Sequence, residues 1–250
     1  INTPRLSSAA SDVYKRQRLS IATAMATGDN PSTPADRLDD VRTVMERAAK
    51  KAGRSLSDVT LIAISKTHGA EAIQPVIDTG QRVFGENRVQ EAQEKWPALK
   101  AETPDIELHL VGQLQSNKAD DAVALFDAIH SVDRSSLVKA LAKAFAKTDR
   151  RPALYVQVKI GAEEQKGGCA IENLPTLLAS ARDKGLEIAG LMCIPPNGLE
   201  PAPYFALLAK LAAENGVSAL SMGMSSDYET AIMCGATHVR VGTALFGARG

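Results

Sequence analysis

Apolar and polar positions along the chain follow two different periods in turn. The stretch ADRLDDVRTVMERAAKKAG, residues 35–53, places its apolar residues on one stripe of a helix and ends at a glycine. Eight short apolar runs follow, separated from one another by stretches of helical period, and such runs are typical of strands buried on both faces. The runs cover residues 61–65, 82–85, 106–112, 128–133, 153–160, 187–193, 219–225 and 237–243.

Strands that alternate with helices pair in parallel. Eight such units within 250 residues predict an α/β protein with a single (β/α)8 TIM barrel and an extra N-terminal helix. The alternative is a doubly wound open sheet, which usually carries a GxGxxG fingerprint after its first strand. The chain has no such fingerprint after residues 61–65, and the barrel is therefore the favoured fold.

The beginning of the chain lacks this pattern. It starts with Ile1, and residues 1–17 show no sustained apolar period. They resemble translated linker sequence, which is excluded from fold reasoning. We expect residues 1–33 to be a disordered or non-native lead-in, with Met25 as a candidate natural start, and residues 34–250 to form the barrel domain.

Composition excludes several classes of function. Lysine and arginine together number 29, as do aspartate and glutamate, so no net charge favours nucleic acid. No apolar run approaches the ~20 residues that span a bilayer. Cys169, Cys193 and Cys234 are far apart and form no CxxC motif, which argues against disulfides and zinc. We expect a cytoplasmic protein with no metal, no nucleic-acid partner and no membrane segment.

Polar residues follow several of the predicted strands. Active sites of such barrels lie at the C-terminal ends of the strands, so these residues should converge on one rim. The residues at these ends are Lys66, Glu86, Asn87, residues 113–118, Ser225, Ser226, Gly242 and Thr243.

The last two of these loops suggest a phosphate ligand. Barrels often bind phosphate with the loops after strands seven and eight, through helix N-termini and backbone N–H groups. Ser225 and Ser226 lie at a predicted helix start, and Gly242 and the Thr243 hydroxyl follow the eighth strand. Ordinary helix capping is the alternative for each loop alone.

Lys66 gives a second indication. Partial desolvation at a barrel mouth favours the neutral, nucleophilic form of an amine, which forms a Schiff base with an aldehyde. An aldehyde that also carries a phosphate fits both features. Pyridoxal 5′-phosphate (PLP) is one such ligand, and the phosphosugar of an aldolase-type barrel is another. Spacing alone leaves both open.

Arg240 bears on that choice. It lies between Val239 and Val241 in the eighth strand, so its side chain points to the opposite face. An arginine only donates hydrogen bonds, and beside a pyridine nitrogen it would keep that nitrogen unprotonated. The ring would then be a weak electron sink, which favours holding PLP over carbanion chemistry. A salt bridge to a barrel carboxylate such as Glu86 is the alternative.

Several motifs occur in order along nearly the whole predicted barrel. LIAISKTHGAEAIQPVIDTGQRVFGENRVQEAQEK is followed by LHLVGQLQSNK, HSVDR, GLMCIPP, LSMGMSSDYETAI and VRVGTALFG. In combination they resemble the pyridoxal phosphate homeostasis protein family over residues 38–249. The resemblance implies a single-domain barrel like the N-terminal domain of alanine racemase. It also implies PLP held as a Schiff base.

Residues that match the family motifs are expected to bind this cofactor. Lys66 would carry the Schiff base, Arg240 would face the pyridine nitrogen, and Ser225 and the Gly242 turn would hold the phosphate. The full cofactor-binding set implied by the resemblance is Lys66, Asn87, Met224, Ser225, Arg240, Gly242 and Thr243. Two positions depart from the family pattern: His68, and residues 163–169, where Lys166 matches a loop lysine.

The resemblance implies a carrier rather than an enzyme. Family proteins are associated with intracellular PLP balance, so the expected partners are PLP and PLP-dependent apo-enzymes, with the chain as a monomer. The alternative is a racemase-like PLP enzyme, which needs a second acid/base opposite the lysine. The tyrosines available for that role, none of them well placed, are Tyr14, Tyr155, Tyr204 and Tyr228. A Schiff-base aldolase leaves Arg240 without a pyridine nitrogen to face.

Overall fold

The computed structural model describes residues 32–161 and 167–247. Contacts along the chain divide it into two units, residues 1–33 and residues 34–250, and the second is described here. The predictions made for Met25, Tyr14 and Lys166 lie outside the described residues.

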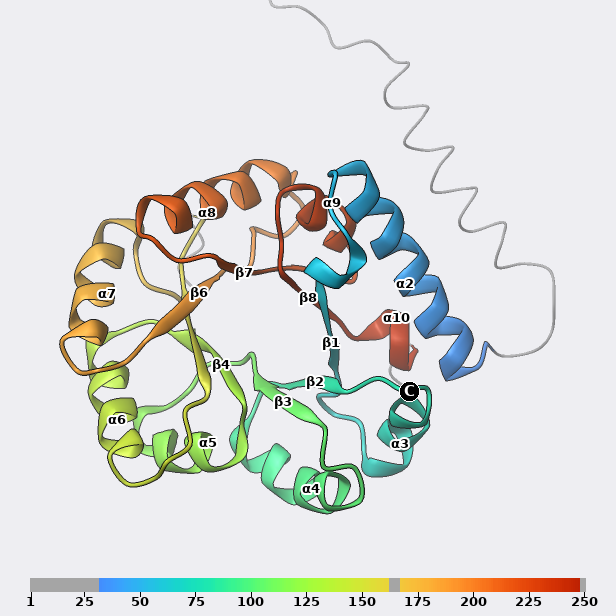
Figure 1. Cartoon of the computed structure of the whole chain (residues 1–250), viewed down its shortest axis with the longest axis horizontal. Coiled ribbons are helices and arrows are strands. Elements are labelled where there is room, and N and C mark those ends of the chain that lie inside the picture. The colour runs from blue at the N-terminus through green and yellow to red at the C-terminus, as the bar shows by residue number, and fades with distance from the viewer. Residues whose placement is uncertain (1–31, 162–166, 248–250) are drawn as a thin grey trace, which may run out of the picture. The chain divides into compact units, whose positions relative to one another are not determined.

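Eight parallel strands close into a barrel in sequence order, and the last pairs with the first (Figure 1). This confirms the predicted (β/α)8 fold, because each strand overlaps its predicted apolar run. The strands are β1 (Thr60–Ile64), β2 (Val83–Glu86), β3 (Glu107–Leu110), β4 (Ala128–Val132), β5 (Ala153–Gln157), β6 (Ile188–Met192), β7 (Ala219–Met224) and β8 (His238–Val241).

Helices surround the barrel and connect consecutive strands (Figure 1). The α-helices are α2 (Pro34–Lys51), α3 (Ala70–Asp78), α4 (Val89–Glu102), α5 (Ala119–Leu125), α6 (Ser135–Phe145), α7 (Leu174–Arg182), α8 (Ala202–Glu214), α9 (Tyr228–Met233) and α10 (Thr243–Phe246). Single 3-10 turns are η1 (Leu56–Asp58), η2 (Ser116–Lys118) and η3 (Ile171–Asn173). No described helix is both long and apolar enough to cross a membrane.

The N-terminal helix α2 completes the outer ring. The helix after β8, α10, has only 4 residues, and α2 packs against both α9 and α10. Its buried face includes Leu38, Val41 and Met45, as the apolar stripe predicts. The side chain of Arg37 donates to the carbonyl of Leu245 at 2.6 Å. The extra helix therefore covers the barrel where the eighth helix of the repeat is short.

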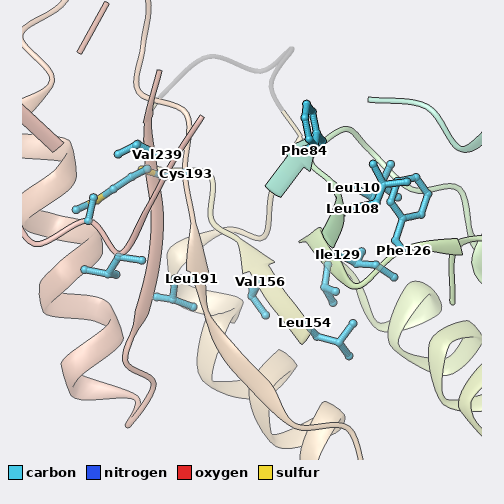
Figure 2. Close-up of a cluster of buried hydrophobic side chains, with 14 of the residues drawn as sticks. Phe84, Leu108, Leu110, Phe126, Ile129, Leu154, Val156, Leu191, Cys193 and Val239 are labelled. Carbon is cyan, nitrogen blue, oxygen red and sulfur yellow. The ribbon is translucent and has the colours of Figure 1, made fainter. Parts of the chain in front are cut away.

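Apolar side chains fill the space between the strands and the helices. Figure 2 shows part of this core, including Phe84, Leu108 and Ile129, all of which are fully buried. Removing a side chain of this size from water contributes roughly 1.5–3 kcal/mol. Side chains of alternate strand residues point into the barrel instead, and there several are polar. His109, between Leu108 and Leu110, is one of them.

Trp96 lies within α4, which continues through Pro97 to Glu102. Trp96 is fully buried against Phe84, with ring centroids 5.0 Å apart. Trp96 therefore packs α4 against β2.

Candidate functional site

All seven predicted binding residues lie at or next to the C-terminal ends of strands. Lys66 follows β1, Asn87 follows β2, and Arg240 lies within β8. Met224 ends β7, followed by Ser225, while Gly242 and Thr243 follow β8. The structure therefore brings the predicted residues to the rim of one barrel. Their contact with a ligand stays a prediction.

Lys66 lies in a tight turn. The amide of His68 donates to the carbonyl of Ser65 at 3.1 Å, which closes the turn around Lys66 and Thr67. Thr67 has φ +67°, the left-handed region, and among the described residues no other non-glycine does. A β-branched residue there is uncommon and costs roughly 1–3 kcal/mol unless its surroundings fix it. The Lys66 ammonium makes no hydrogen bond or ion pair to any described residue.

Behind this turn lies a buried carboxylate. Glu86, the last residue of β2, is fully buried, and its Oε1 accepts from the Ser65 hydroxyl at 2.6 Å and the Trp96 indole at 3.0 Å. The same oxygen lies 2.8 Å from the Lys95 ammonium. Its Oε2 is buried and has no hydrogen-bond partner among the described residues. Glu86 thus joins β1 and β2 to α4.

The sequence expected Glu86 on the rim and as an alternative partner for Arg240, and both expectations are wrong. Strand alternation explains why. Gly85, its neighbour, faces the barrel axis, where an added Cβ would lie within 3 Å of side-chain atoms of Ile62 and Ile64. Glu86 therefore faces outward, towards α4.

Asn87 is held at the rim by a close backbone approach. A Cβ added to Gly112, after β3, would lie 2.1 Å from the Asn87 carbonyl oxygen and 2.7 Å from its Cα. Only glycine lets the two backbones pack this closely. Gly112 is a residue that sequence reasoning missed, although the motif LVGQL ends its strand with a glycine.

Arg240 is a buried cation with neutral partners. Its side chain is 5% exposed, Nη1 donates to the Ser221 hydroxyl at 2.8 Å, and Nη2 donates to the Cys193 carbonyl at 2.9 Å. No described carboxylate forms an ion pair with it, and its Nε donates to none of the described residues. Burial lowers the pKa of the guanidinium, yet arginine stays charged in proteins. A buried charge without a counter-ion is costly and is retained mainly at functional sites.

A hydrogen-bonded chain of side chains continues below Arg240 inside the barrel. Because Arg240 can only donate, the Ser221 oxygen accepts from it, and the Ser221 hydroxyl hydrogen is free to reach His130 Nδ1 at 2.8 Å. His130 Nε2 lies 3.1 Å from Nδ1 of His109. Complete burial, then the charges of His109, His238 and Arg240, hold the pKa of His130 well below its usual value. His130 is therefore neutral, and His109 is hydrogen-bonded in the interior rather than simply packed.

Tyr155 also lies inside the barrel, away from the rim. Its ring stacks on His130 with centroids 4.1 Å apart, and its hydroxyl lies 3.3 Å from His238 Nε2. Burial, then the charge of Glu107, raises the pKa of Tyr155 to about 12. It is a core residue, as its sequence context predicts.

The loops after β7 and β8 form the other side of the rim. The Gly242 amide donates to the Ser225 hydroxyl at 3.3 Å, which links the two loops. Asp227 Oδ1 accepts from the Met224 amide at 2.6 Å and makes no cap hydrogen bond to α9. The Thr243 side chain is exposed. Ordinary capping therefore does not account for these polar residues, and the phosphate site stays a prediction.

Polar side chains of the loop after β3 contact neighbouring residues of the protein. Ser116 is the first residue of η2, whose N-cap residue is Gln115. The Ser116 hydroxyl accepts from Arg134 at 3.4 Å, because Arg134 Nη2 is fixed beside it by the Leu114 carbonyl. Lys118 pairs with Asp121 at 3.2 Å. The described residues contain no group of three or more metal-ligating side chains that could hold a metal ion.

Residues 37–250 match the sequence model of the family described as "Alanine racemase, N-terminal domain". The pyridoxal phosphate homeostasis protein of Pseudomonas aeruginosa is 40% identical over 232 residues, which cover 87% of this chain and 96% of the relative. The protein of the same name from Aquifex aeolicus is 39% identical over 224 residues, covering 86% of this chain and 97% of the relative.

Solved structures agree with these matches. PipY of Synechococcus elongatus PCC7942 with PLP bound is 42% identical, with a TM-score of 0.73, and the match covers 82% of this chain and all of that chain. The same protein without PLP has a TM-score of 0.77 at 41% identity, covering 85% and 99%. Alanine racemase of Clostridium difficile, at 13% identity and a TM-score of 0.63, shares the fold over 84% of this chain and 57% of its own.

Proposed function

The chain belongs to the pyridoxal phosphate homeostasis protein family, and from this we propose that it binds PLP covalently through Lys66. Relatives at 39–40% identity carry that name, and a relative at 42% identity has been solved with PLP bound. The observation that carries the proposal is a pair of cations at one barrel mouth. Lys66 presents an ammonium with no partner among the described residues, and Arg240 is buried without a carboxylate.

The residues present fit the three recognisable parts of PLP. The aldehyde would react with the Lys66 amine. The pyridine nitrogen is a neutral acceptor, and the Arg240 guanidinium would donate a hydrogen bond to it. The phosphate would lie at the β7 and β8 loops, where the Ser225 and Thr243 hydroxyls are exposed and Gly242 lets the backbone approach. Asn87 and Met224 would line the ring between these ends.

PLP bound here would supply an aldehyde and a conjugated ring, and the chain would supply little further chemistry. Arg240 would donate to the ring nitrogen and keep it unprotonated, which would leave the ring a weak electron sink. No described tyrosine lies free at the rim to act as a second acid/base. Tyr155 is in the barrel interior, and Tyr204 and Tyr228 lie on α8 and α9. This supports a carrier over a racemase-like enzyme.

We further propose that the protein buffers PLP in the cytoplasm and delivers it to PLP-dependent apo-enzymes, acting as a monomer. The three cysteines are free, which suits a reducing compartment. Zero net charge gives no strong field that would favour binding to nucleic acid.

An absorption titration tests the proposal. Purified protein is mixed with increasing PLP, and the visible band of the bound form is followed for the wild type, Lys66→Ala and Arg182→Ala. Arg182 ends α7 on the outside of the barrel and serves as the matched control. We expect saturable binding at one site in the wild type and in the control, and loss of the band in Lys66→Ala. Equal bands in all three proteins would overturn the assignment of Lys66.

A further inference from the structure

We propose that Lys95 and Glu91, two residues on the outer helix α4, are positioning residues that fix the direction of Lys66. The inference deepens the proposed function and rests on it. Both side chains project from α4 and contact the turn that carries the amine.

Lys95 connects to the Lys66 turn at both of its ends. Its ammonium donates to the carbonyl of Ser65, immediately before Lys66, and to the carbonyl of His68, two residues after it, both at 3.0 Å. The Lys95 side chain is only 10% exposed. An ordinary surface lysine would reach water, but the three hydrogen bonds of this ammonium go to the two turn carbonyls and to Glu91 Oε1.

Glu91 holds the middle of the same turn. Its Oε1 accepts from the amide of Thr67 at 2.5 Å and from Lys95 at 3.0 Å. Thr67 is the residue with φ +67°, so the bond forms where the backbone is least favourable on its own. Although desolvation opposes it, the Thr67 amide and the Lys95 ammonium lower the pKa of Glu91. The carboxylate is thus charged at neutral pH.

A second carboxylate, that of the buried Glu86, connects Lys95 to the barrel. Glu86 Oε1 lies 2.8 Å from the Lys95 ammonium and also accepts from the Ser65 hydroxyl at 2.6 Å. The ammonium of Lys95 is therefore tied to the end of β2, to the end of β1 and to α4 together. A helical i,i+4 pair on its own would need none of these contacts.

The geometry explains why a strained turn is kept at this position. Lys66 must leave the strand end at a fixed angle for its amine to meet an aldehyde whose phosphate is held on the opposite side of the rim. A relaxed turn would let the Lys66 side chain sample many directions. A fixed direction lowers the entropy lost on covalent attachment and slows the reverse hydrolysis, because the amine stays in place.

The test measures how fast bound PLP is lost. Wild type, Lys95→Met, Glu91→Gln and Lys100→Met are loaded with PLP and diluted into an excess of an apo-enzyme that traps it, and the loss of PLP is followed by the activity that this enzyme gains. Lys100→Met is the matched control, because Lys100 lies on the same helix in an ion pair with Asp127 at 2.7 Å, away from the turn. Circular dichroism and thermal midpoints check the folding of each variant.

We expect Lys95→Met to lose PLP at least about tenfold faster than wild type, Glu91→Gln to fall between, and Lys100→Met to match wild type. Hydrogen exchange on the apo-proteins should show the Thr67 and His68 amides less protected in Lys95→Met, the Thr67 amide less protected in Glu91→Gln as well, and both amides unchanged in Lys100→Met. If Lys95→Met unfolds, Thr67→Gly is added to it, because glycine tolerates the positive φ. This double variant should fold and should lose PLP faster than Thr67→Gly alone.

Two negative results are distinguishable. Wild-type protein that takes up no PLP would overturn the proposed function and this inference with it. Wild-type protein that binds PLP at Lys66 while Lys95→Met and Lys100→Met show equal loss rates and equal exchange would overturn the inference alone.

Discussion

The two sides of the barrel mouth are built differently. On the β1 and β2 side, the Lys66 turn is backed by a buried charge network in which Glu86 and Lys95 take part. On the β7 and β8 side, Ser225 and Thr243 are exposed, and a hydrogen bond of 3.3 Å from the Gly242 amide to the Ser225 hydroxyl links the two loops. A residue that must form a covalent bond in one direction needs a rigid support. Groups that recognise an anion by hydrogen bonds work best when their donors are left free.

The largest effect should come from a substitution at Gly112, which packs against Asn87 at the end of β2. A Cβ there would lie 2.1 Å from the Asn87 carbonyl oxygen, and backbone cannot move aside cheaply. We expect Gly112→Ala to lower the free energy of unfolding by about 3 kcal/mol. Urea denaturation measures it, with Gln115→Ala, an exposed change in the same loop, as the control. A loss no larger than the control's would show that Asn87 is not held by this contact.

Acid should lower the free energy of unfolding, because the pKa of His238 inside the barrel is lowered. Burial, then the charge of His109, lowers the pKa of His238 to about 4, with Glu107 opposing and Arg240 adding to the shift. An unfolded histidine titrates near 6.5, so between these values the unfolded chain binds more protons. The free energy of unfolding therefore falls as pH drops from about 6.5 towards 4, and the share of His238 is about 2 kcal/mol between neutral pH and pH 5.

Replacing His238 measures its contribution to this pH dependence. His238→Gln removes the titrating ring, so the variant should lose less stability between pH 7.5 and pH 5 than the wild type does. His130, whose pKa is also lowered, keeps part of the slope with the same sign. Identical slopes in urea melts of the two proteins would show that His238 titrates normally in the folded state.

Arg240, buried on β8, should matter for PLP binding and not for the stability of the fold. Replacing it by methionine removes one charge-assisted donor, which should weaken PLP binding by about tenfold. Because no described carboxylate pairs with Arg240, the apo-protein should keep or raise its thermal midpoint. Calorimetry of the apo-protein checks the second statement. A drop of several degrees in the apo midpoint with unchanged PLP affinity would mean that Arg240 serves the fold alone.

The smallest effect on PLP binding and stability is expected on the β7 and β8 side. Ser225 is exposed, and among the described residues its hydroxyl accepts one hydrogen bond, from the Gly242 amide at 3.3 Å; Ser225→Ala removes this hydroxyl. We expect PLP affinity to fall about threefold and stability to change by less than about 0.5 kcal/mol. Pyridoxal without its phosphate should bind wild type and variant alike. A variant that loses both ligands equally would place the phosphate elsewhere.

The sequence predicted most of the barrel because short runs of apolar residues mark its strands. Each strand is a short apolar run, and the end of the run fixes which residue reaches the rim, as Lys66 does after β1. Strand alternation also placed Arg240 inside, where it is buried. Motif resemblance then indicated the ligand.

The sequence could not predict contacts between residues that lie far apart along the chain. Lys95 contacts the carbonyl of Ser65 although 30 positions separate them, and it reads as an exposed helix lysine. Glu86 was misplaced because the polar motif FGEN suggested a rim cluster, while alternation after Gly85 turns it towards Trp96. The partners of Arg240, a serine on β7 and a carbonyl after β6, depend on barrel closure and are invisible to any periodicity.

Borohydride trapping tests the central claim most directly. Protein loaded with PLP is reduced, digested and mapped by mass spectrometry, and the reduction fixes PLP to whichever amine it was bound. The account predicts one phosphopyridoxyl group per chain, on the peptide that contains Lys66. An adduct spread over several surface lysines, or one on another lysine with Lys66 unmodified, would contradict it.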